Sequence, residues 1–341
     1  MNFSIHTFEL RLEVSPVYIC KIRNWLYSKH IPIIDGKCFL NILQYSDMGV
    51  RIHFYFDYRK PYLAFIVNLR EVGGNRNLVD LIDPENFDSA LEQANGIIYN
   101  FLEGKYDINS LKLCRIDLCV NIDVGSQEAV DTYLKLLNYK SGSRGGYKIQ
   151  NINSPNGYSE NEFLTENRAV GISISVYNKK AQLLDINREK EAERAEGILR
   201  VEVQLKRHKT IKNLFSAKFT NPEIIKTALL HSREIMADIL AKAIPQGDYY
   251  RLADAIDLVS NNVDKEKMVM RMVRLLELTS KKHSTSLAKE ALFSEDKKLS
   301  NQYYRNMLEE FGDLNLNTVT LGRKCSFDYL KGLSSFFTDL Q

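Results

Sequence analysis

The chain lacks several features that would assign it to a common functional class. Its 341 residues contain no G-x-x-x-x-G-K-[ST] loop and no G-x-G-x-x-G after a strand, so nothing supports nucleotide-triphosphate or dinucleotide binding. The five cysteines include no C-x-x-C pair, which argues against a zinc ribbon and favours reduced thiols in a cytoplasmic protein. No apolar run approaches the roughly 20 residues that cross a bilayer, and the charged, alternating N-terminus does not resemble a signal peptide.

Charge is nearly balanced, and the hydrophobic content is ordinary. The chain has 46 lysines and arginines against 43 aspartates and glutamates, a net charge of +3, and 44% of its residues are hydrophobic. This composition is typical of an ordered globular protein. It does not by itself indicate a nucleic-acid partner, although it permits a local basic surface. A chain of this length is expected to hold two or three structural units.

Hydrophobic periodicity predicts an α+β fold with an internal duplication. Two copies of a β-α-β-β-β-α unit, residues 1–108 and 109–220, are expected to form antiparallel sheets, either separate or joined. The first copy is expected to carry strands at 3–14, 38–44, 50–58 and 62–70, with helices after Pro16 and at 84–102. The second is expected to carry strands at 111–123, 147–151, 171–178 and 198–206, with helices at 125–138 and 210–216. The polar stretch 151–167 is predicted to be a loop.

The pattern becomes helical from residue 221 to residue 341, which predicts an all-helical C-terminal domain. Within it, two short helices at 284–293 and 300–311 flank the polar turn SEDKK. This spacing is compatible with a helix-turn-helix whose second helix enters a major groove, although helix pairs that do not bind DNA are commoner.

Three predicted strands each carry one apolar and one polar face. They read RIDLCVNID at 115–123, ISISVYNK at 172–179 and LRVEVQLK at 199–206. Side chains on a strand point to opposite faces with period two. If the three strands share a sheet, its polar face carries Asp117, Tyr177, Lys179, Arg200 and Glu202 together.

These residue types are suited to metal-assisted phosphoryl transfer. Asp117 and Glu202, with Asp123 further along the first strand, are hard oxygen ligands of the kind that Mg²⁺ or Mn²⁺ prefers. A tyrosine beside such an ion can attack a phosphodiester. Lys179, two residues from Tyr177, is expected to point to the same face, where it could lower the pKa of that tyrosine or neutralise the phosphorane.

Cations of the same region are predicted to contact DNA phosphates. Arg115 and Arg200 offer planar guanidinium groups that suit a phosphate or can orient the carboxylates. Lys206, Arg207 and Lys209 form a basic cluster after the third strand. For any single strand a simpler interpretation exists, because Arg and Glu side chains on an exposed antiparallel sheet make ordinary cross-strand ion pairs. We favour a functional site because three such strands follow one another, with a Tyr-Asn-Lys segment between the two acidic ones.

The order of three motifs resembles that of a known family. R-I-D-x-x-x-N-x-D is followed by V-Y-N-K-K-A-Q-L and then by L-R-V-E-V-Q-L-K, over roughly residues 112–207. This order resembles the plasmid replication-initiation and conjugative-relaxase family of rolling-circle initiators, and the replication initiators of filamentous phages. The resemblance implies a DNA nickase that acts through a tyrosine, stays attached to the 5′ end and frees a 3′-hydroxyl for synthesis. By motif position, it implies that Asp117 and Glu202 hold the metal and that Tyr177 and Lys179 form the Tyr–Lys motif.

Two features depart from the family pattern. Many nicking enzymes bind metal through a His-hydrophobic-His pair, whereas the six histidines here are scattered, so any metal site is expected to rest on carboxylates. In relatives a tyrosine often precedes the Tyr-Asp-Lys motif, but the corresponding stretch, EFLTENRAVG, contains none. The nucleophile therefore stays open between Tyr177, Tyr158 in an upstream polar segment, and another tyrosine such as Tyr147, or none.

The leading hypothesis is a cytoplasmic replication initiator of a plasmid, phage or mobile element. It would nick and rejoin single-stranded or hairpin origin DNA and would require Mg²⁺ or Mn²⁺. The alternative is a non-catalytic protein with a degenerate nickase fold that binds origin DNA or a replication partner such as a host helicase or polymerase. A structural or assembly protein of a mobile element is a third hypothesis. No membrane partner is expected, and the sequence leaves a homodimer open.

Overall fold

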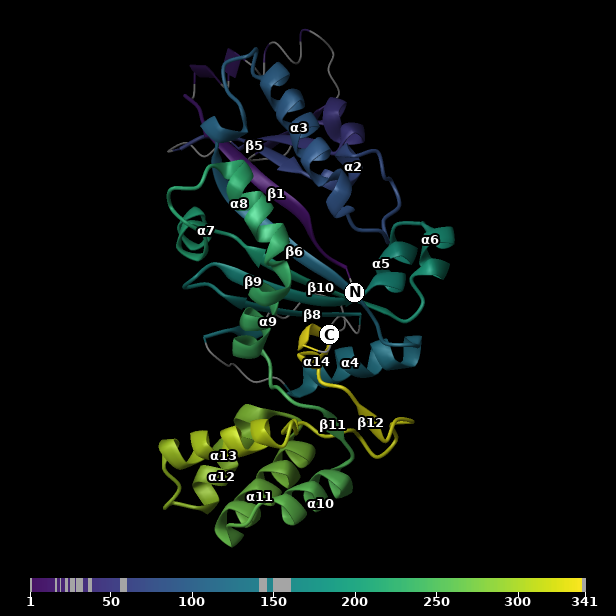
Figure 1. Cartoon of the computed structure of the whole chain (residues 1–341), viewed down its shortest axis with the longest axis vertical. Coiled ribbons are helices and arrows are strands. Elements are labelled where there is room, and N and C mark those ends of the chain that lie inside the picture. Colours follow the sequence, from purple (N-terminus) through teal and green to yellow (C-terminus); the bar gives the residue numbers. More distant parts are fainter. Residues whose placement is uncertain are drawn as a thin grey trace.

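A ten-stranded antiparallel sheet runs through the first two thirds of the chain in the computed structural model (Figure 1). The structure describes residues 2–15, scattered positions between 17 and 28, and residues 33–35, 39–55, 60–140, 146–149 and 161–338. The strands of the large sheet are β1 (Phe3–Glu13), β2 (Ile33–Asp35), β3 (Phe39–Ile42), β4 (Val50–Tyr55), β5 (Tyr62–Val67), β6 (Lys112–Asp123), β7 (Lys148–Ile149), β8 (Glu162–Asn167), β9 (Ile172–Asn178) and β10 (Ile198–Leu205).

The strand order confirms the predicted duplication within an α+β fold. It runs β2-β3-β4-β5-β1-β6-β10-β9-β8-β7, so the first strand of each copy, β1 or β6, lies at the centre beside the other. On its outer side, each of these strands pairs with the last strand of its own copy, β5 or β10. The two copies are thus joined into one sheet by the β1–β6 ladder, and each contributes five strands.

Each copy has one strand more than the sequence predicted. In the second copy the additional strand is β8, which lies in the stretch expected to be a loop. Its alternation is weak, because only Phe163 and Thr165 are buried among polar neighbours. In the first copy the additional strand is the short β2, and the helix predicted after Pro16 lies largely outside the described residues.

Alternating apolar positions bury one face of the sheet under helices. The core side chains of β6 are Ile116, Leu118, Val120 and Ile122, each fully buried. Helices of the first 243 residues are α2 (Leu69–Val72), α3 (Pro84–Phe101), α4 (Gln127–Lys140), α5 (Lys179–Asp185), α6 (Glu189–Arg194), α7 (His208–Leu214), α8 (Asn221–Leu230) and α9 (Ser232–Ala243), with 3₁₀ turns η1 (Leu43–Met48) and η2 (Ile108–Ser110). Figure 1 shows α8 and α9 crossing the sheet, where they contact β1 and β6.

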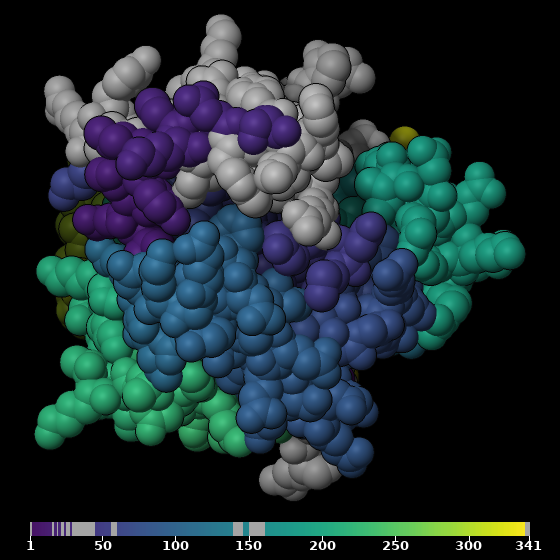
Figure 2. All heavy atoms as spheres, turned by 90° about the horizontal axis from the view of Figure 1, so that it is seen from above, coloured from purple at the N-terminus to yellow at the C-terminus, as the bar shows by residue number. Residues whose placement is uncertain are grey.

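Local signals explain where the main helices begin. Asp83 caps α3 by accepting a hydrogen bond from the Glu85 N–H, and Pro84 is its first residue. Thr220 and Glu223 form a capping box at the start of α8. Viewed from the end of the molecule that carries α3, the teal segment of α5 and α6 projects from one side of the molecule (Figure 2).

A second hydrophobic core lies in the helical region after residue 251. It is formed by α10 (Leu252–Asn262), α11 (Glu266–Lys282), α12 (Thr285–Glu295) and α13 (Asn301–Asp313). The helix pair expected from the sequence is present as α12 and α13, and its contact with DNA stays a prediction. The region also contains a two-stranded ladder, β11 (Tyr249–Tyr250) with β12 (Tyr329–Leu330), which the sequence did not predict.

The division between the two cores differs from the predicted domain boundary at residue 220. Helices α8 and α9 belong to the core of the sheet, and so do Leu330, Leu333 and Phe337 near the C-terminus. The short helix α14 (Ser335–Thr338) therefore packs near α9, after the chain has passed through the helical region. In the described ranges, no helix is both long enough and apolar enough to cross a bilayer.

Candidate functional site

The polar face of the sheet gathers the motif residues from three adjacent strands. In the β6–β10 ladder, Asp117 lies opposite Gln204 and Glu202 lies opposite Cys119. Asp117 and Glu202 are thus diagonal neighbours on one face, a relationship that places strand positions about 7–8 Å apart. Tyr177 on β9 lies opposite Arg200, the residue two positions before Glu202. The predicted association of Asp117, Tyr177, Arg200 and Glu202 is therefore present.

Three side chains lie within hydrogen-bond or ion-pair distance of one carboxylate oxygen of Glu202. The Tyr177 hydroxyl donates a 2.7 Å hydrogen bond to Glu202 Oε1. Arg200 Nε and His6 Nδ1 each lie 3.3 Å from the same oxygen. Burial disfavours the charged carboxylate, but the neighbouring His6 and Arg200 outweigh it and lower the pKa of Glu202. Glu202 is thus an ionised, buried carboxylate held in place by its neighbours.

The pKa of Asp117 is shifted in the opposite direction from that of Glu202. Burial raises the pKa of its carboxyl to about 6, although Arg115, 3.2 Å from Oδ2, opposes the shift. Thr7 donates a hydrogen bond to Oδ2, and the charge of Glu202 adds to the rise. The other oxygen, Oδ1, is buried and has no hydrogen-bond partner among the residues that the structure describes. The face therefore carries one firmly ionised carboxylate beside one that titrates near neutral pH.

A β-bulge in β1 delivers two of these neighbours to the site. The β1–β6 register shifts between Ile5, opposite Leu118, and Thr7, opposite Asp117, which leaves His6 as the extra residue. A bulge turns side chains out of simple alternation. His6 thereby reaches Glu202 and Thr7 reaches Asp117, while Ile5 stays in the core. No sequence pattern points to His6 or Thr7, because they lie more than 100 residues from their partners.

Tyr177 does not have the properties expected of an activated nucleophile. Its side chain is buried, and burial together with the charge of Glu202 raises its pKa well above the usual value. The expectation that Lys179 lowers this pKa is wrong. Strand β9 ends at Asn178, whose side chain caps α5, so Lys179 is the first residue of a helix and its Nζ donates to Gln182 Oε1.

Lys179 nevertheless belongs to the buried charge network. Burial, followed by the proximity of Arg200, lowers its pKa to about 8. Arg200 also donates to Asn121 Oδ1 at 3.1 Å, and Asn121 donates to the Val79 carbonyl at 2.7 Å. Val79 packs with α5 and α6 in a small separate cluster, so these elements cover the polar face at Arg200.

Asp123 is not part of this group. It lies six positions along β6 from Asp117, which corresponds to about 20 Å at the rise of a strand. Its Oδ1 accepts a hydrogen bond from the Gly125 N–H, and the residue is exposed. The prediction of Asp123 as a third ligand of the same ion is therefore wrong.

The predicted DNA-binding cations occupy two environments. Arg115 and Arg200 are engaged with the carboxylates of the polar face. Lys206 Nζ lies 3.4 Å from Glu166, and Arg207 donates to the carbonyls of Arg168 and Ala169. Their roles toward DNA stay predictions.

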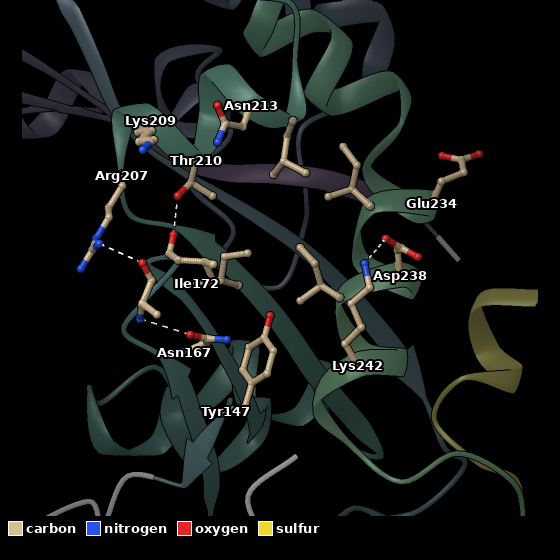
Figure 3. Close-up of a pocket in the computed structure, with 15 residues that line it drawn as sticks. Tyr147, Asn167, Ile172, Arg207, Lys209, Thr210, Asn213, Glu234, Asp238 and Lys242 are labelled. Atoms are coloured by element: carbon tan, nitrogen blue, oxygen red, sulfur yellow. Dashed lines mark hydrogen bonds and ion pairs between the residues drawn. The ribbon is translucent and has the colours of Figure 1, made fainter. Parts of the chain in front are cut away.

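Lys209 and Arg207 line a cavity of about 950 Å³ between β9, α7 and α9 (Figure 3). Ile172, Ile235 and Ile239 form part of its apolar lining. Tyr147, the third tyrosine considered as a nucleophile, is buried at this cavity, and its hydroxyl points into it in Figure 3. Tyr147 therefore belongs to a different environment from Asp117 and Glu202. Tyr158 lies outside the described residues.

The polar face fits a divalent ion only as a site of two carboxylates. Within the described ranges, no three His, Cys, Asp or Glu side chains form a group that could hold a metal. Asp117 Oδ1 is buried and accepts no hydrogen bond from the described part of the chain, so it is the donor atom that suits a cation. Mg²⁺ is commonly held by one or two carboxylates that leave positions for water and phosphate oxygens, so Asp117 with Glu202 satisfies the minimum.

Comparisons with known proteins give a similarity to a solved structure. No family model and no curated protein matches the chain. Among solved structures, the chain is similar to a rolling circle replication initiator protein from Geobacillus stearothermophilus, with 13% identity over 72% of this chain and 86% of that chain. The TM-score is 0.36, a value too low to establish a shared fold or to transfer the role of any residue.

Proposed function

We propose that this chain is a replication initiation protein that nicks and rejoins one strand of origin DNA with Mg²⁺ or Mn²⁺. The observation that supports the proposal is the buried network on the polar face, where Asp117, Tyr177 and Glu202 meet from three strands. Buried carboxylates are costly unless they are compensated, and their strongly shifted pKa values are typical of functional sites. The motif order of rolling-circle initiators leads independently to the same three residues.

Asp117 and Glu202 are the residues proposed to hold the ion. When bound, a divalent cation polarises the scissile phosphate and stabilises the leaving oxygen. Arg115 and Arg200 orient the two carboxylates through their ion pairs. Because the pKa of Asp117 is raised to about 6, this carboxylate is expected to become available to a cation only toward neutral pH.

Tyr177 is proposed as a positioning residue, and Tyr158 as the nucleophile. The Tyr177 hydroxyl is committed to Glu202, whereas Tyr158 comes from the polar segment just before β8. In the proposed reaction the tyrosine oxygen bonds to phosphorus and the bond from phosphorus to the 3′-oxygen breaks. The proton of the phenol ends on that 3′-oxygen. The products are a 5′-phosphotyrosine and a free 3′-hydroxyl, and reversal of the step rejoins the strand.

A covalent-adduct assay tests this proposal. Full-length protein, Mn²⁺ or Mg²⁺ and labelled single-stranded DNA from its own replicon should give a labelled protein band under denaturing conditions. Tyr158→Phe should abolish the band, whereas Tyr177→Phe should reduce it without abolishing it. Asp117→Asn with Glu202→Gln should remove the dependence on metal together with the activity. Failure of the wild-type protein to form an adduct or a nick with several candidate origins would falsify the enzymatic proposal.

A second candidate function is a non-catalytic origin-binding protein. It is favoured by the locked Tyr177–Glu202 pair and by β8, which carries Phe163 and Leu164 and no tyrosine. This candidate predicts origin binding that is unchanged by EDTA and by the Asp117→Asn and Glu202→Gln substitutions. The same set of variants therefore separates the two functions.

A further inference from the structure

The segment that follows β10 is basic and lies outside the candidate site. Residues 203–222 contain five lysines and arginines and no aspartate or glutamate. They cover the end of β10, helix α7 and the loop that leads into α8, and Figure 1 shows α7 at the edge of the sheet where β10 ends. The positive charge of this segment is therefore not compensated by acids of its own sequence.

Hydrogen bonds attach both ends of this segment to the start of β6. The His208 Nδ1–H donates to the Leu113 carbonyl at 2.8 Å. The Asn221 side-chain amide donates to the Leu111 carbonyl at 2.7 Å. Lys112 lies between the residues that carry these two carbonyls, and it is exposed. The fold thus places a lysine of β6 beside the basic segment.

Four lysines of this region form what we call the lysine surface: Lys112, Lys209, Lys212 and Lys218. Lys212 is partly exposed, and the other three are exposed. Lys212 Nζ donates to the Phe219 carbonyl at 3.0 Å. None of the four forms an ion pair with an acid in the part of the chain that the structure describes, whereas Lys226 on the neighbouring α8 pairs with Asp88 at 2.7 Å. The lysine surface is therefore available to an external anion.

The other two cations of the segment are already engaged. Lys206 Nζ lies 3.4 Å from Glu166. Arg207 donates to two carbonyls of the turn between β8 and β9, and a Cβ added at Gly171 in that turn would lie 2.5 Å from the Arg207 side chain. Arg207 thus holds this turn against the start of α7. The lysine surface, rather than Lys206 or Arg207, supplies the cations that remain for a partner.

Lys112 connects the lysine surface with the candidate site along β6. A shift in the β1–β6 register places Lys112 opposite Arg11, so its side chain points to the polar face of the sheet. Asp117 lies five positions further along β6, which corresponds to about 17 Å at the rise of a strand, and Arg115 lies between them. A strand of DNA whose phosphates contact the lysine surface can therefore follow the polar face to the carboxylates.

We propose that the lysine surface binds the phosphate backbone of single-stranded DNA beside the candidate site, without reading its bases. A lysine ammonium is a compact charge on a flexible stem, which contacts phosphate oxygens and carries no base specificity. Continuity with the polar face through Lys112 and Arg115 favours a DNA strand over an anionic membrane as the partner. The inference rests on the proposed function, because it takes the strand that is nicked as the partner and adds the surface that holds it.

Binding of a fluorescein-labelled oligothymidine to the full chain, measured by anisotropy in EDTA at several salt concentrations, tests this inference. On a single strand, each phosphate contact steepens the fall of log K with log salt by about 0.7, because it releases a counterion. The slope should therefore become less steep by about 0.7 in each of four variants: Lys112→Gln, Lys209→Gln, Lys212→Gln and Lys218→Gln. The fourfold Gln variant should lose about 3 from the slope. Arginine at the same four positions keeps the charges and should keep the wild-type slope.

Lys190→Gln is the matched control, because Lys190 is an exposed lysine on α6 and should leave the slope unchanged. Figure 2 shows the teal segment of α6 and the green segment of α8 on opposite sides of the molecule. Because no metal is present, binding can succeed where nicking fails, and the two proposals are judged separately. The inference is overturned if wild type does not bind the oligothymidine or if the fourfold Gln variant keeps the wild-type slope. It is also overturned if that variant loses binding to phosphatidylserine vesicles while its DNA binding is unchanged.

Discussion

The Tyr177 hydroxyl donates a 2.7 Å hydrogen bond to Oε1 of Glu202, so the two motif residues act on each other inside the protein. Tyr177 lowers the pKa of Glu202, and the charge of Glu202 raises the pKa of Tyr177. The pair stabilises the ionised carboxylate and the neutral phenol together. The hydrogen bond fixes the position of the carboxylate, and it does not prepare the tyrosine for attack.

Two substitutions in this pair are expected to lower the free energy of unfolding by different amounts. Tyr177→Phe removes one hydrogen bond to a charged acceptor, for which we expect a loss of about 1.5–3 kcal/mol in the free energy of unfolding. Glu202→Gln leaves the buried Arg200 without its carboxylate, and breaking a buried pair in this way costs about 3–5 kcal/mol. Urea denaturation at pH 7 measures both values. Equal losses for the two variants would show that the charge of Glu202 is not what holds Arg200.

A pH dependence follows from the raised pKa of Asp117. The unfolded carboxyl has a pKa of 3.8 and the folded one a pKa of about 6, so the folded state resists ionisation. The stability that the neutral Asp117 carboxyl contributes is therefore fully present below about pH 4, and it is lost as the pH rises through about 6. The difference, about 2 pKa units, corresponds to about 3 kcal/mol. Asp117→Asn cannot ionise, so its stability relative to wild type should increase by up to that amount between pH 4 and pH 7.

Urea denaturation in EDTA at several pH values measures this difference. Asp123→Asn is the matched control, because Asp123 is an exposed aspartate of the same strand. The same series on Asp123→Asn shows how much of the pH dependence comes from replacing an aspartate at another position of β6. A constant difference between Asp117→Asn and wild type would mean that Asp117 ionises normally in the folded protein.

A single buried aspartate, Asp248, ties the C-terminal segment to the linker between the two cores. Its Oδ2 accepts from Asn315 Nδ2 at 2.9 Å and from the Tyr329 hydroxyl at 2.7 Å. Its Oδ1 accepts from the Gly332 N–H at 2.6 Å and from the Ser335 hydroxyl at 3.3 Å. The four donors come from the segment after α13, so Asp248 fixes the path by which the chain returns to the sheet.

Asp248→Ala is expected to weaken the attachment of the segment after α13 to the linker at residue 248. Loss of the acceptor leaves several donors uncompensated, each at about 1–3 kcal/mol, so we expect a total cost above 3 kcal/mol. Limited proteolysis followed by mass spectrometry should show faster cleavage after residue 313. Asp313→Ala, a change at an exposed aspartate at the end of α13, should cleave like wild type. Unchanged cleavage of Asp248→Ala would show that the apolar contacts of Leu333 and Phe337 are enough to hold the C-terminal segment against the sheet.

Much of the fold was predictable because its strands alternate strongly. From Ile116 to Ile122 in β6, and throughout β10, every second residue is apolar and fully buried. This pattern predicted the strands, their two faces and the presence of Asp117 and Glu202 on the same face. Strand β8 was missed because only two of its six positions are buried. Lys179 was assigned to a strand because the alternation runs on by one residue beyond the point where Asn178 caps a helix.

The sequence by itself determined which residues share the polar face, since alternation and motif order select Asp117, Tyr177, Arg200 and Glu202 without reference to any other part of the chain. Only the tertiary structure decided their electrostatic state. The bulge in β1 brings His6 and Thr7 to carboxylates more than 100 residues away, and α5, α6 and the segment at Val79 cover the face. A pKa depends on burial and on nearby charge, and both are set by contacts between distant segments that no local pattern encodes.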